Sequence, residues 1–381
     1  MTVFTAARAL TPSARIAPAR IETRDGLIVS VGPAADEDDP SRCIDLGEVT
    51  LVPGFVDLHA HGGGGRSFTE GSDAAAAVLR THLVHGTTSM VASLVTDTVT
   101  RLEQQIRALA PMWRSGDLIG IHLEGPWLSG LHAGAHDREL LRDPDPNDIE
   151  RLLAVDPGAV VMVTLAVERT GGPGAVRQLV DAGVTVALGH SDATFEQAHD
   201  AIEQGAMVAT HLFNSQRAMK HREPGLALAL LENSNVTVEL IIDGAHLHDA
   251  MVRHVVGVAG QRVAFVSDAM AAAGTDDGDY HLGPLPVRVR GGVARLIEAG
   301  PGSEVGPFAG STLTLDRALR YAVQTIGIPL DDAVRAVTLT PARALGRPDL
   351  GRLIAGCRAD IVALDEGLDV RAVVRGGVRV S

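Results

Sequence analysis

Residues 49–61 read VTLVPGFVDLHAH, an apolar run that ends in a His-x-His pair. The apolar part, 49–57, predicts a β-strand, and its nearly continuous hydrophobicity is typical of a parallel sheet buried on both faces. Because alternate residues of an extended strand face the same side, the side chains of His59 and His61 point the same way. This stretch therefore predicts a buried parallel strand with two imidazoles at its carboxyl end.

Further apolar runs follow at the spacing of strands, at 88–94, 118–123, 160–167, 184–188, 206–212, 236–242 and 263–267. Helical patterns lie between them, for example at 73–85, 174–182, 196–203 and 225–231. Eight strands that alternate with helices over about 220 residues predict an α/β fold, the (β/α)8 TIM barrel. The alternative is a doubly wound open sheet, but no Gly-x-Gly-x-x-Gly follows the first strand.

The two ends of the chain have a different pattern from the middle. Short β-like segments lie at 19–23, 26–31, 359–364 and 371–380. Because chain termini tend to lie close together, these segments predict a small β-sandwich domain built from both ends. A turn at Gly291-Gly292 also predicts a β insertion near 278–300. The expected domains are two parts of a small β domain, 1–50 and 346–381, and a barrel between them, 51–345.

The composition limits the possible functions. Lys plus Arg total 33 and Asp plus Glu total 47, so the net charge is −14, and only 3% of the residues are aromatic. An acidic chain with no basic run is a poor nucleic-acid binder. No apolar run reaches the about 18 residues of a membrane span, and the N-terminus lacks the apolar core of a signal peptide. We therefore expect a cytoplasmic protein with no nucleic-acid or membrane partner.

The chain has one lysine, Lys220, against 15 histidines. A histidine follows Lys220, so the Gly-Lys-Ser/Thr of a P-loop is absent. Arg217 stands three residues before it, which excludes a Ser-x-x-Lys motif. Cys43 and Cys357 form no Cys-x-x-Cys motif, so we expect free thiols in a reducing compartment. The excess of histidine over lysine favours metal chemistry.

Residues that can bind metals or protons stand at most of the predicted strand ends, where the chemistry of a (β/α)8 barrel gathers. In chain order they are His59, His61, Glu124, His190, His211, His246 and Asp268. Each one alone is more often structural, but together they predict a metal site. Imidazole and carboxylate suit zinc and similar metals. We expect one or two divalent metals per subunit, zinc first, with iron or manganese as alternatives.

A two-metal centre needs a bridging ligand. A carboxylated lysine serves in many barrel hydrolases, but Lys220 does not lie at a predicted strand end. Glu124 is therefore the expected bridge, with the histidines of the first strand on one metal and those of the fifth and sixth strands on the other. Asp268 is the expected general base, because a metal lowers the pKa of bound water to about 7 and a nearby carboxylate can take the proton and return it to a leaving amine.

Seven segments together resemble the motif series of the N-acetylglucosamine-6-phosphate deacetylase family, in the amidohydrolase superfamily. They are PGFVDLHAHGGGG, IHLEGPWLSGLHAGAH, GHSDATFEQA, THLFNSQRAMKHREPG, DGAHLHD, VSDAMAAAG and FAGSTLTLD. The resemblance extends from about residue 52 to the terminal GRLIAGCRADIVALD, which is nearly the whole chain. Its motifs are specific in sequence and in order.

The resemblance implies roles for the strand-end residues. Glu124, His190 and His211 match the metal ligands found throughout the family, and Asp268 matches its catalytic acid/base. The first His-x-His pair matches the extra ligands of members that hold a second metal. A further catalytic residue is implied at His136, near the acetyl carbonyl.

The resemblance also implies substrate contacts and a homodimer. The implied contacts with a phosphorylated amino sugar are Ala135, Asn214, Ser215, Arg222, His246 and Phe308, the last in a loop at 308–311 that closes over the sugar. In similar enzymes the arginine and the histidine reach the active site of the neighbouring subunit. The chain departs from the family at Ser215-Gln216, where HLFNAM is usual, but a serine backbone N–H can still meet a phosphate.

The expected function is metal-dependent hydrolysis of N-acetyl-D-glucosamine 6-phosphate to D-glucosamine 6-phosphate and acetate. One alternative is another amidohydrolase that acts on a related N-acyl or cyclic amide, against which the GAH and REPG motifs argue. The other is a barrel that has lost its chemistry, although every expected ligand is present. Several further histidines are expected to be structural, among them His82, solvated or capping, and His122, packed one layer below the ligands.

Overall fold

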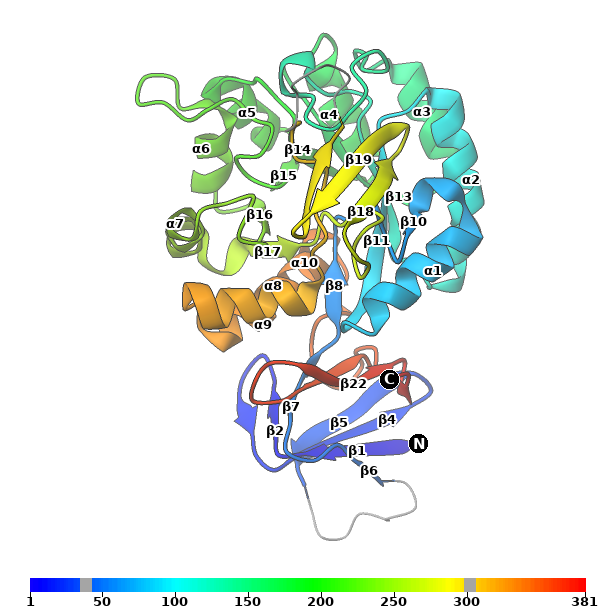
Figure 1. The fold of residues 1–381 in the computed structure, drawn as a ribbon, viewed down its shortest axis with the longest axis vertical. Helices are drawn as coiled ribbons and strands as arrows, with labels where there is room; N and C mark the ends of the chain where they lie inside the picture. The colour runs from blue at the N-terminus through cyan, green and yellow to red at the C-terminus, as the bar shows by residue number, and fades with distance from the viewer. Residues whose placement is uncertain (35–42, 298–305) are drawn as a thin grey trace.

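The computed structural model describes residues 1–34, 43–297 and 306–381. Eight parallel strands form its largest sheet (Figure 1), in the order β17-β16-β15-β14-β13-β12-β11-β8. Their bounds are β8 (Phe55–Asp57), β11 (Thr87–Val95), β12 (Gly120–Glu124), β13 (Val160–Leu165), β14 (Thr185–Leu188), β15 (Ala206–Ala209), β16 (Thr237–Ile241) and β17 (Val263–Val266). Nearly every residue of these strands is buried, as expected for a parallel sheet with both faces covered.

The two edge strands of this sheet, β8 and β17, meet just beyond their carboxyl ends. There the Asp268 N–H donates to the His59 carbonyl at 2.8 Å, and the His61 N–H donates to the Ala269 carbonyl at 2.7 Å. Backbone hydrogen bonds of the predicted metal-site residues therefore close the barrel, and the predicted (β/α)8 architecture is confirmed.

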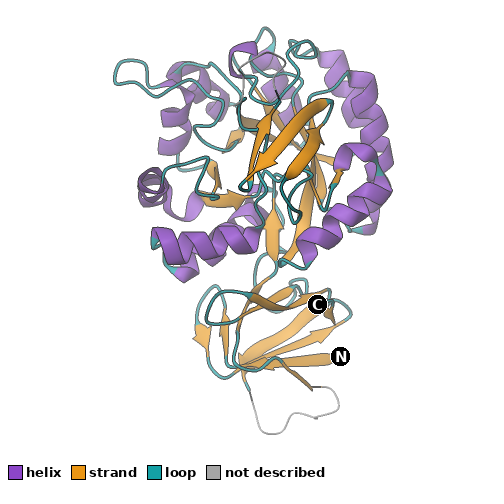
Figure 2. Ribbon diagram, in the orientation of Figure 1, coloured by secondary structure: helices purple, strands orange, loops and turns teal. Residues whose placement is uncertain are grey.

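Helices surround the sheet (Figure 2). Their bounds are α1 (Ser72–Leu83), α2 (Val99–Ser115), α3 (Pro146–Ala154), α4 (Gly172–Asp181), α5 (Phe195–Glu203), α6 (Gly225–Glu232), α7 (Asp249–Ala259), α8 (Leu315–Tyr321), α9 (Leu330–Val337) and α10 (Leu339–Ala344). Most present an apolar stripe to the sheet, typical of amphipathic helices on a barrel. Within the described ranges, none of the helices is both long enough and apolar enough to span a bilayer.

The predicted strand at 49–57 is in fact two strands that meet at Gly54. β7 (Thr50–Pro53) pairs with β2 (Arg8–Leu10) and with β21 (Ile361–Leu364), outside the barrel, whereas β8 enters the barrel. A Cβ atom on Gly54 would lie 2.2 Å from the Thr88 Oγ1 atom. The prediction of one continuous strand is wrong because the chain changes sheets where only glycine fits against β11.

Strands from both chain ends form two further sheets beside the barrel (Figure 1). Besides β2, β7 and β21, they are β1 (Thr2–Ala6), β3 (Arg15–Ile16), β4 (Ala19–Arg24), β5 (Leu27–Pro33), β6 (Cys43–Asp45), β22 (Val370–Arg375) and β23 (Val378–Arg379). The two sheets share a buried cluster of their own that includes Phe4, Ile21, Leu51 and Ile361. The predicted β-sandwich from both termini is confirmed, and the exact domain boundaries stay a prediction.

A three-stranded antiparallel sheet is inserted after β17. Its strands are β18 (Gly278–Leu282), β19 (Leu285–Arg290) and β20 (Val293–Leu296). Its inner side packs on Val95, Met270 and Ala271, which follow or end barrel strands, so the insertion sits on the carboxyl end of the barrel. The predicted insertion near 278–300 corresponds to these strands; residues 298–300 lie outside the described residues. Two short strands, β9 (Gly62–Gly63) and β10 (Arg66–Ser67), form a hairpin after β8.

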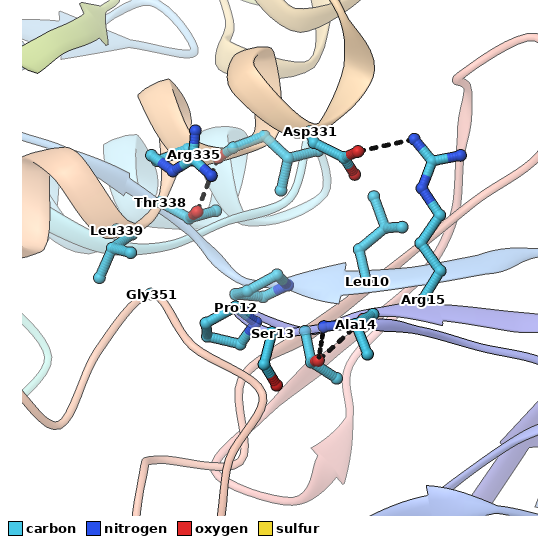
Figure 3. A pocket seen from close by; sticks show the side chains of 13 residues that line it. Leu10, Pro12, Ser13, Ala14, Arg15, Asp331, Arg335, Thr338, Leu339 and Gly351 are labelled. Atoms are coloured by element: carbon cyan, nitrogen blue, oxygen red, sulfur yellow. Dashed lines mark hydrogen bonds and ion pairs between the residues drawn. The ribbon is translucent and has the colours of Figure 1, made fainter. Parts of the chain in front are cut away.

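A cavity of about 250 Å³ lies where the terminal strands face the barrel helices (Figure 3). The Arg15 guanidinium crosses its edge to the Asp331 carboxylate at 2.7 Å. Both side chains are half exposed or more, so this ion pair adds little stability. None of the described residues that line this cavity is a predicted site residue.

The change of sheets at Gly54 gives a test of the fold. Gly54→Ala forces a methyl group into Thr88, so we expect the free energy of unfolding to fall by about 1–3 kcal/mol. Gly32→Ala is the matched control, since a Cβ there has nothing within 4 Å, and we expect a change within about 0.5 kcal/mol. Denaturant unfolding measures both. Equal stability of the two variants would contradict the close packing at Gly54.

Candidate metal centre

The site residues occupy the turns that end the barrel strands. His190 follows β14, His211 follows β15 and Asp268 follows β17, and all three have a positive φ, of 48°, 28° and 46°. Non-glycine residues rarely adopt this left-handed conformation, and such strain gathers at functional sites. The backbone turns at these points so that three side chains from separate strands aim at one place.

Six of the predicted residues form two groups of potential metal donors. His59, His61 and Asp268 make the first group, and Glu124, His190 and His211 make the second. In each group one donor atom from every residue lies within 4.8 Å of the others, and all six side chains are buried. The structure thus brings together every residue that the sequence proposed as a ligand or as the general base.

The Glu124 carboxylate lies between the two groups. Its Oε1 atom is 3.1 Å from the Nε2 atoms of both His190 and His211. Its Oε2 atom faces the other group, 3.1 Å from His61 Nε2 and 3.4 Å from His59 Nε2. One oxygen toward each group is the arrangement that a bridging carboxylate requires.

Hydrogen bonds on the far side of three imidazoles fix the direction of their lone pairs. His61 Nδ1 lies 3.2 Å from the Ser93 carbonyl oxygen, and His190 Nδ1 lies 2.9 Å from the His132 carbonyl oxygen. A carbonyl only accepts, so each Nδ1 carries the proton and each Nε2 turns a lone pair inward. His59 Nδ1 faces the Glu239 carboxylate at 3.2 Å with the same effect.

The donor set fits divalent metal ions. The Nε2 atoms of His59 and His61 are 3.2 Å apart, and those of His190 and His211 are 3.1 Å apart. Two inward lone pairs at this distance repel each other unless a cation lies between them, either a metal ion or a proton on one of the rings. Although burial opposes the charged form, Glu124 and Asp268 raise the pKa of His59 and of His61, which favours that proton when no metal is bound. Imidazole nitrogens with carboxylate oxygens are the donors that zinc and similar metals prefer. The centre therefore matches a divalent metal in chemistry as well as in geometry.

The electrostatics of the site keep both carboxylates ionised. Burial opposes the charged form of Asp268, but His59 and His61 outweigh it and lower the pKa of this carboxyl to about 2. Burial likewise opposes the charge on Glu124, and the surrounding imidazoles lower its pKa well below the usual value. At neutral pH Asp268 is therefore a carboxylate that can accept a proton.

His136 stands beside the centre as a neutral donor. Burial lowers the pKa of its imidazole to about 4. Its Nδ1 atom faces the Thr96 hydroxyl at 2.8 Å and the Thr96 backbone N–H, which only donates, at 3.4 Å, whereas its Nε2 atom faces a carboxylate, which only accepts; this places the ring proton on Nε2. That Nε2 atom lies 3.4 Å from Glu124 Oε2. His136 can therefore donate a hydrogen bond to a group bound above the centre.

A cavity of about 210 Å³ opens above the metal donors. Its lining includes five of the predicted substrate contacts, which are Ala135, Asn214, Ser215, His246 and Phe308. Arg222 is different: it is exposed in the loop before α6 and does not line the cavity. The structure thus brings all the predicted substrate contacts except Arg222 to one cavity. His246, which the resemblance implies in the neighbouring subunit's site, lines the cavity of its own chain instead, because the loop after β16 turns its ring onto Phe308.

Two of the histidines expected to be structural have different outcomes. His122 lies buried beneath the ligands, where Nδ1 faces Ser93 Oγ at 2.9 Å and Nε2 faces Thr164 Oγ1 at 2.8 Å, as the spacing predicted. His82 is fully buried rather than solvated, and its Nε2 atom faces the Gly62 carbonyl at 2.9 Å. The prediction for His82 is wrong because α1 turns this side chain inward, under the glycine loop after β8.

Two charged residues at the site were not predicted from the sequence. Glu239 is fully buried in β16, and its Oε2 atom accepts from His59 Nδ1 and from the His211 backbone N–H, each at 3.2 Å. Arg295 enters the cavity from β20. A carboxylate inside the otherwise apolar segment TVELI was a signal for Glu239. No local pattern distinguishes Arg295 from the other arginines of the hairpin.

Comparison with known proteins identifies the family to which the chain belongs. Residues 50–380 match the sequence profile of the amidohydrolase family, so the chain belongs to that family.

Its relatives are deacetylases of amino sugar phosphates. The N-acetylgalactosamine-6-phosphate deacetylase of Escherichia coli O157:H7 is 33% identical over 97% of each chain. The N-acetylglucosamine-6-phosphate deacetylase of Lysinibacillus sphaericus is 33% identical over 87% of this chain and 86% of its own. The solved N-acetyl-D-glucosamine-6-phosphate deacetylase of Mycobacterium smegmatis is 45% identical over the whole of both chains, with a TM-score of 0.94. The resemblance indicated by the motifs is confirmed.

The contact of Glu239 with both donor groups gives a testable consequence. Glu239→Gln removes the charge that holds His59 Nδ1–H, so we expect zinc affinity to fall about 10- to 100-fold. Competition with a chromophoric chelator measures it. Glu232→Gln, at the exposed end of α6, is the control and should bind zinc as the wild type does. Unchanged affinity in Glu239→Gln would show that this carboxylate does not support the centre.

Proposed function

We propose that the chain hydrolyses the acetamide of N-acetyl-D-glucosamine 6-phosphate, giving D-glucosamine 6-phosphate and acetate. The observation that carries the proposal is the pair of donor groups joined by Glu124 at the floor of a cavity lined by Asn214, Ser215 and His246. The activity for which the relatives from Lysinibacillus sphaericus and Mycobacterium smegmatis are named supports the same reaction.

Divalent metal ions held by the two groups would lower the pKa of a bound water and polarise the acetamide carbonyl. Asp268 then acts as general base, because its carboxylate is ionised and its Oδ1 atom lies 3.3 Å from His61 Nε2, at the centre of the donor set. Asp268 takes a proton from water as the water oxygen attacks the carbonyl carbon. It returns that proton to the sugar nitrogen as the C–N bond breaks.

His136 and the cavity wall position the substrate. The Nε2–H of His136 can donate to the acetamide oxygen, where negative charge develops in the transition state. Asn214, Ser215 and His246 offer polar groups for the sugar and its phosphate. His246 is held by Asp243, whose Oδ2 atom lies 2.7 Å from His246 Nδ1.

We propose zinc as the metal, a homodimer as the assembly and the cytoplasm as the compartment. The mixed nitrogen and oxygen donors support zinc. The position of Arg222, exposed and away from its own cavity, supports a role in a neighbouring subunit's site. The free thiols of Cys43 and Cys357 support a reducing compartment.

The role of Asp268 can be tested by Asp268→Asn. Loss of the proton acceptor should reduce kcat at least about 100-fold, because general-base catalysis contributes about 10²- to 10⁴-fold. Zinc should still bind, since the other five donors remain. Steady-state kinetics and metal analysis give the two readouts. Asp276→Asn, on an exposed residue of the following loop, is the control. A near-normal kcat in Asp268→Asn would assign the base elsewhere.

A substrate panel tests the proposed reaction. We expect acetate release from N-acetyl-D-glucosamine 6-phosphate, and a kcat/KM lower by at least about 100-fold for the sugar without phosphate, since remote binding energy contributes to catalysis. N-acetyl-D-galactosamine 6-phosphate belongs in the panel, because one relative is named for that substrate. No release from either phosphorylated sugar would refute the proposal.

A further inference from the structure

Arg295 is a cation placed in the wall of the cavity. It lies in β20 of the inserted sheet, and its side chain lines the cavity together with Pro307 and Phe308. Among the described residues of that lining it is the only arginine or lysine. The floor of the same cavity holds the carboxylates of Glu124 and Asp268. The site therefore has a negative floor and one permanently positive group on its wall.

The guanidinium is held in place without a carboxylate partner. Its Nη1 atom donates to the Gly306 carbonyl at 2.9 Å, and its central carbon lies 4.1 Å from the centre of the Phe308 ring. The backbones of Arg295 and Phe308 also pair as an antiparallel bridge. No ion pair to Arg295 occurs within the described part of the chain, although the chain carries a net charge of −14. A half-buried guanidinium without a counter-ion is a site that an anion can complete.

The ring of Phe308 connects Arg295 to the predicted phosphate contacts. The His246 ring packs against the Phe308 ring, with centroids 4.5 Å apart and the planes tilted by 34°. Arg295, Phe308 and His246 thus form one packed series along the cavity wall, contributed by β20, by the loop at 306–311 and by the loop after β16. The substrate's anionic end can meet this wall while its acetamide faces the metal donors.

We propose that Arg295 is a specificity-determining residue that binds the phosphate group of the substrate from within the same subunit. This inference rests on the proposed function and deepens it. The planar guanidinium offers two N–H groups to phosphate oxygens while Nη1 stays on Gly306. The inserted sheet then has a function: it brings the one arginine of the described lining to a cavity whose lining carboxylates are those of Glu124 and Asp268.

The test compares Arg295→Gln with Arg290→Gln on phosphorylated and unphosphorylated N-acetyl-D-glucosamine. Arg290 lies in the same inserted sheet, is exposed and does not line the cavity, so it matches the change in net charge. We expect Arg295→Gln to lower kcat/KM about 10- to 100-fold for the phosphorylated sugar, mainly through KM. For the unphosphorylated sugar, kcat/KM of Arg295→Gln should stay within about 3-fold of the wild-type value. The kcat/KM of Arg290→Gln should stay within the same limit for both sugars. Arg295→Lys should recover part of the loss, because it keeps the charge but not the planar fork.

Equal losses of Arg295→Gln on both sugars would overturn the proposal and indicate a packing role for the residue. No loss on either sugar would overturn it as well. If the wild-type protein hydrolyses neither sugar, the proposed function fails separately. Calorimetric titration with D-glucosamine 6-phosphate and with D-glucosamine then still tests Arg295, since only the phosphorylated sugar should bind more weakly to Arg295→Gln. Identical binding to wild type and variant would overturn the proposal.

Discussion

The structure of the site depends on histidine side chains whose Nε2 lone pairs are held pointing toward one another. The Nε2 atoms of four imidazoles face inward around the Glu124 carboxylate, at 3.1 to 3.4 Å from its oxygens. Without a metal ion or a proton between the rings this arrangement is unfavourable. The protein maintains it with carbonyl and carboxylate acceptors behind three of the four rings, with strained turns at three strand ends, and with barrel closure through the loops that carry His59 and Asp268.

The need to hold these donor atoms together explains why distant parts of the chain meet at this site. A parallel barrel gathers the carboxyl ends of its strands at one rim, so each strand can contribute one donor. Glu239 adds a connection beneath the rim, since its Oε2 atom contacts His59 of one group and the backbone of His211 of the other. The two groups are therefore parts of one buried network.

Much of this organisation could be predicted from the sequence. Parallel strands have a clear apolar pattern, and His-x-His on an extended strand puts both rings on one side, so the strands and the six donors could be named in advance. The break at Gly54 could not, because it depends on the distance to Thr88 on another strand. The burial of His82 and the position of Arg295 likewise depend on tertiary packing. Arg222 lies away from the cavity of its own chain, a placement that the motif alone does not give.

The two-metal centre proposed for the six buried donors, with Glu124 as the bridge, can be tested by its metal content. The most direct measurement is the zinc content of the protein after chelation and equilibrium dialysis against zinc, with acetate release followed in the same samples. We expect two zinc ions per chain, and turnover that is absent after chelation and returns as zinc binds. Full turnover by the metal-free chain, or zinc binding that leaves these donors unoccupied, would contradict this proposal.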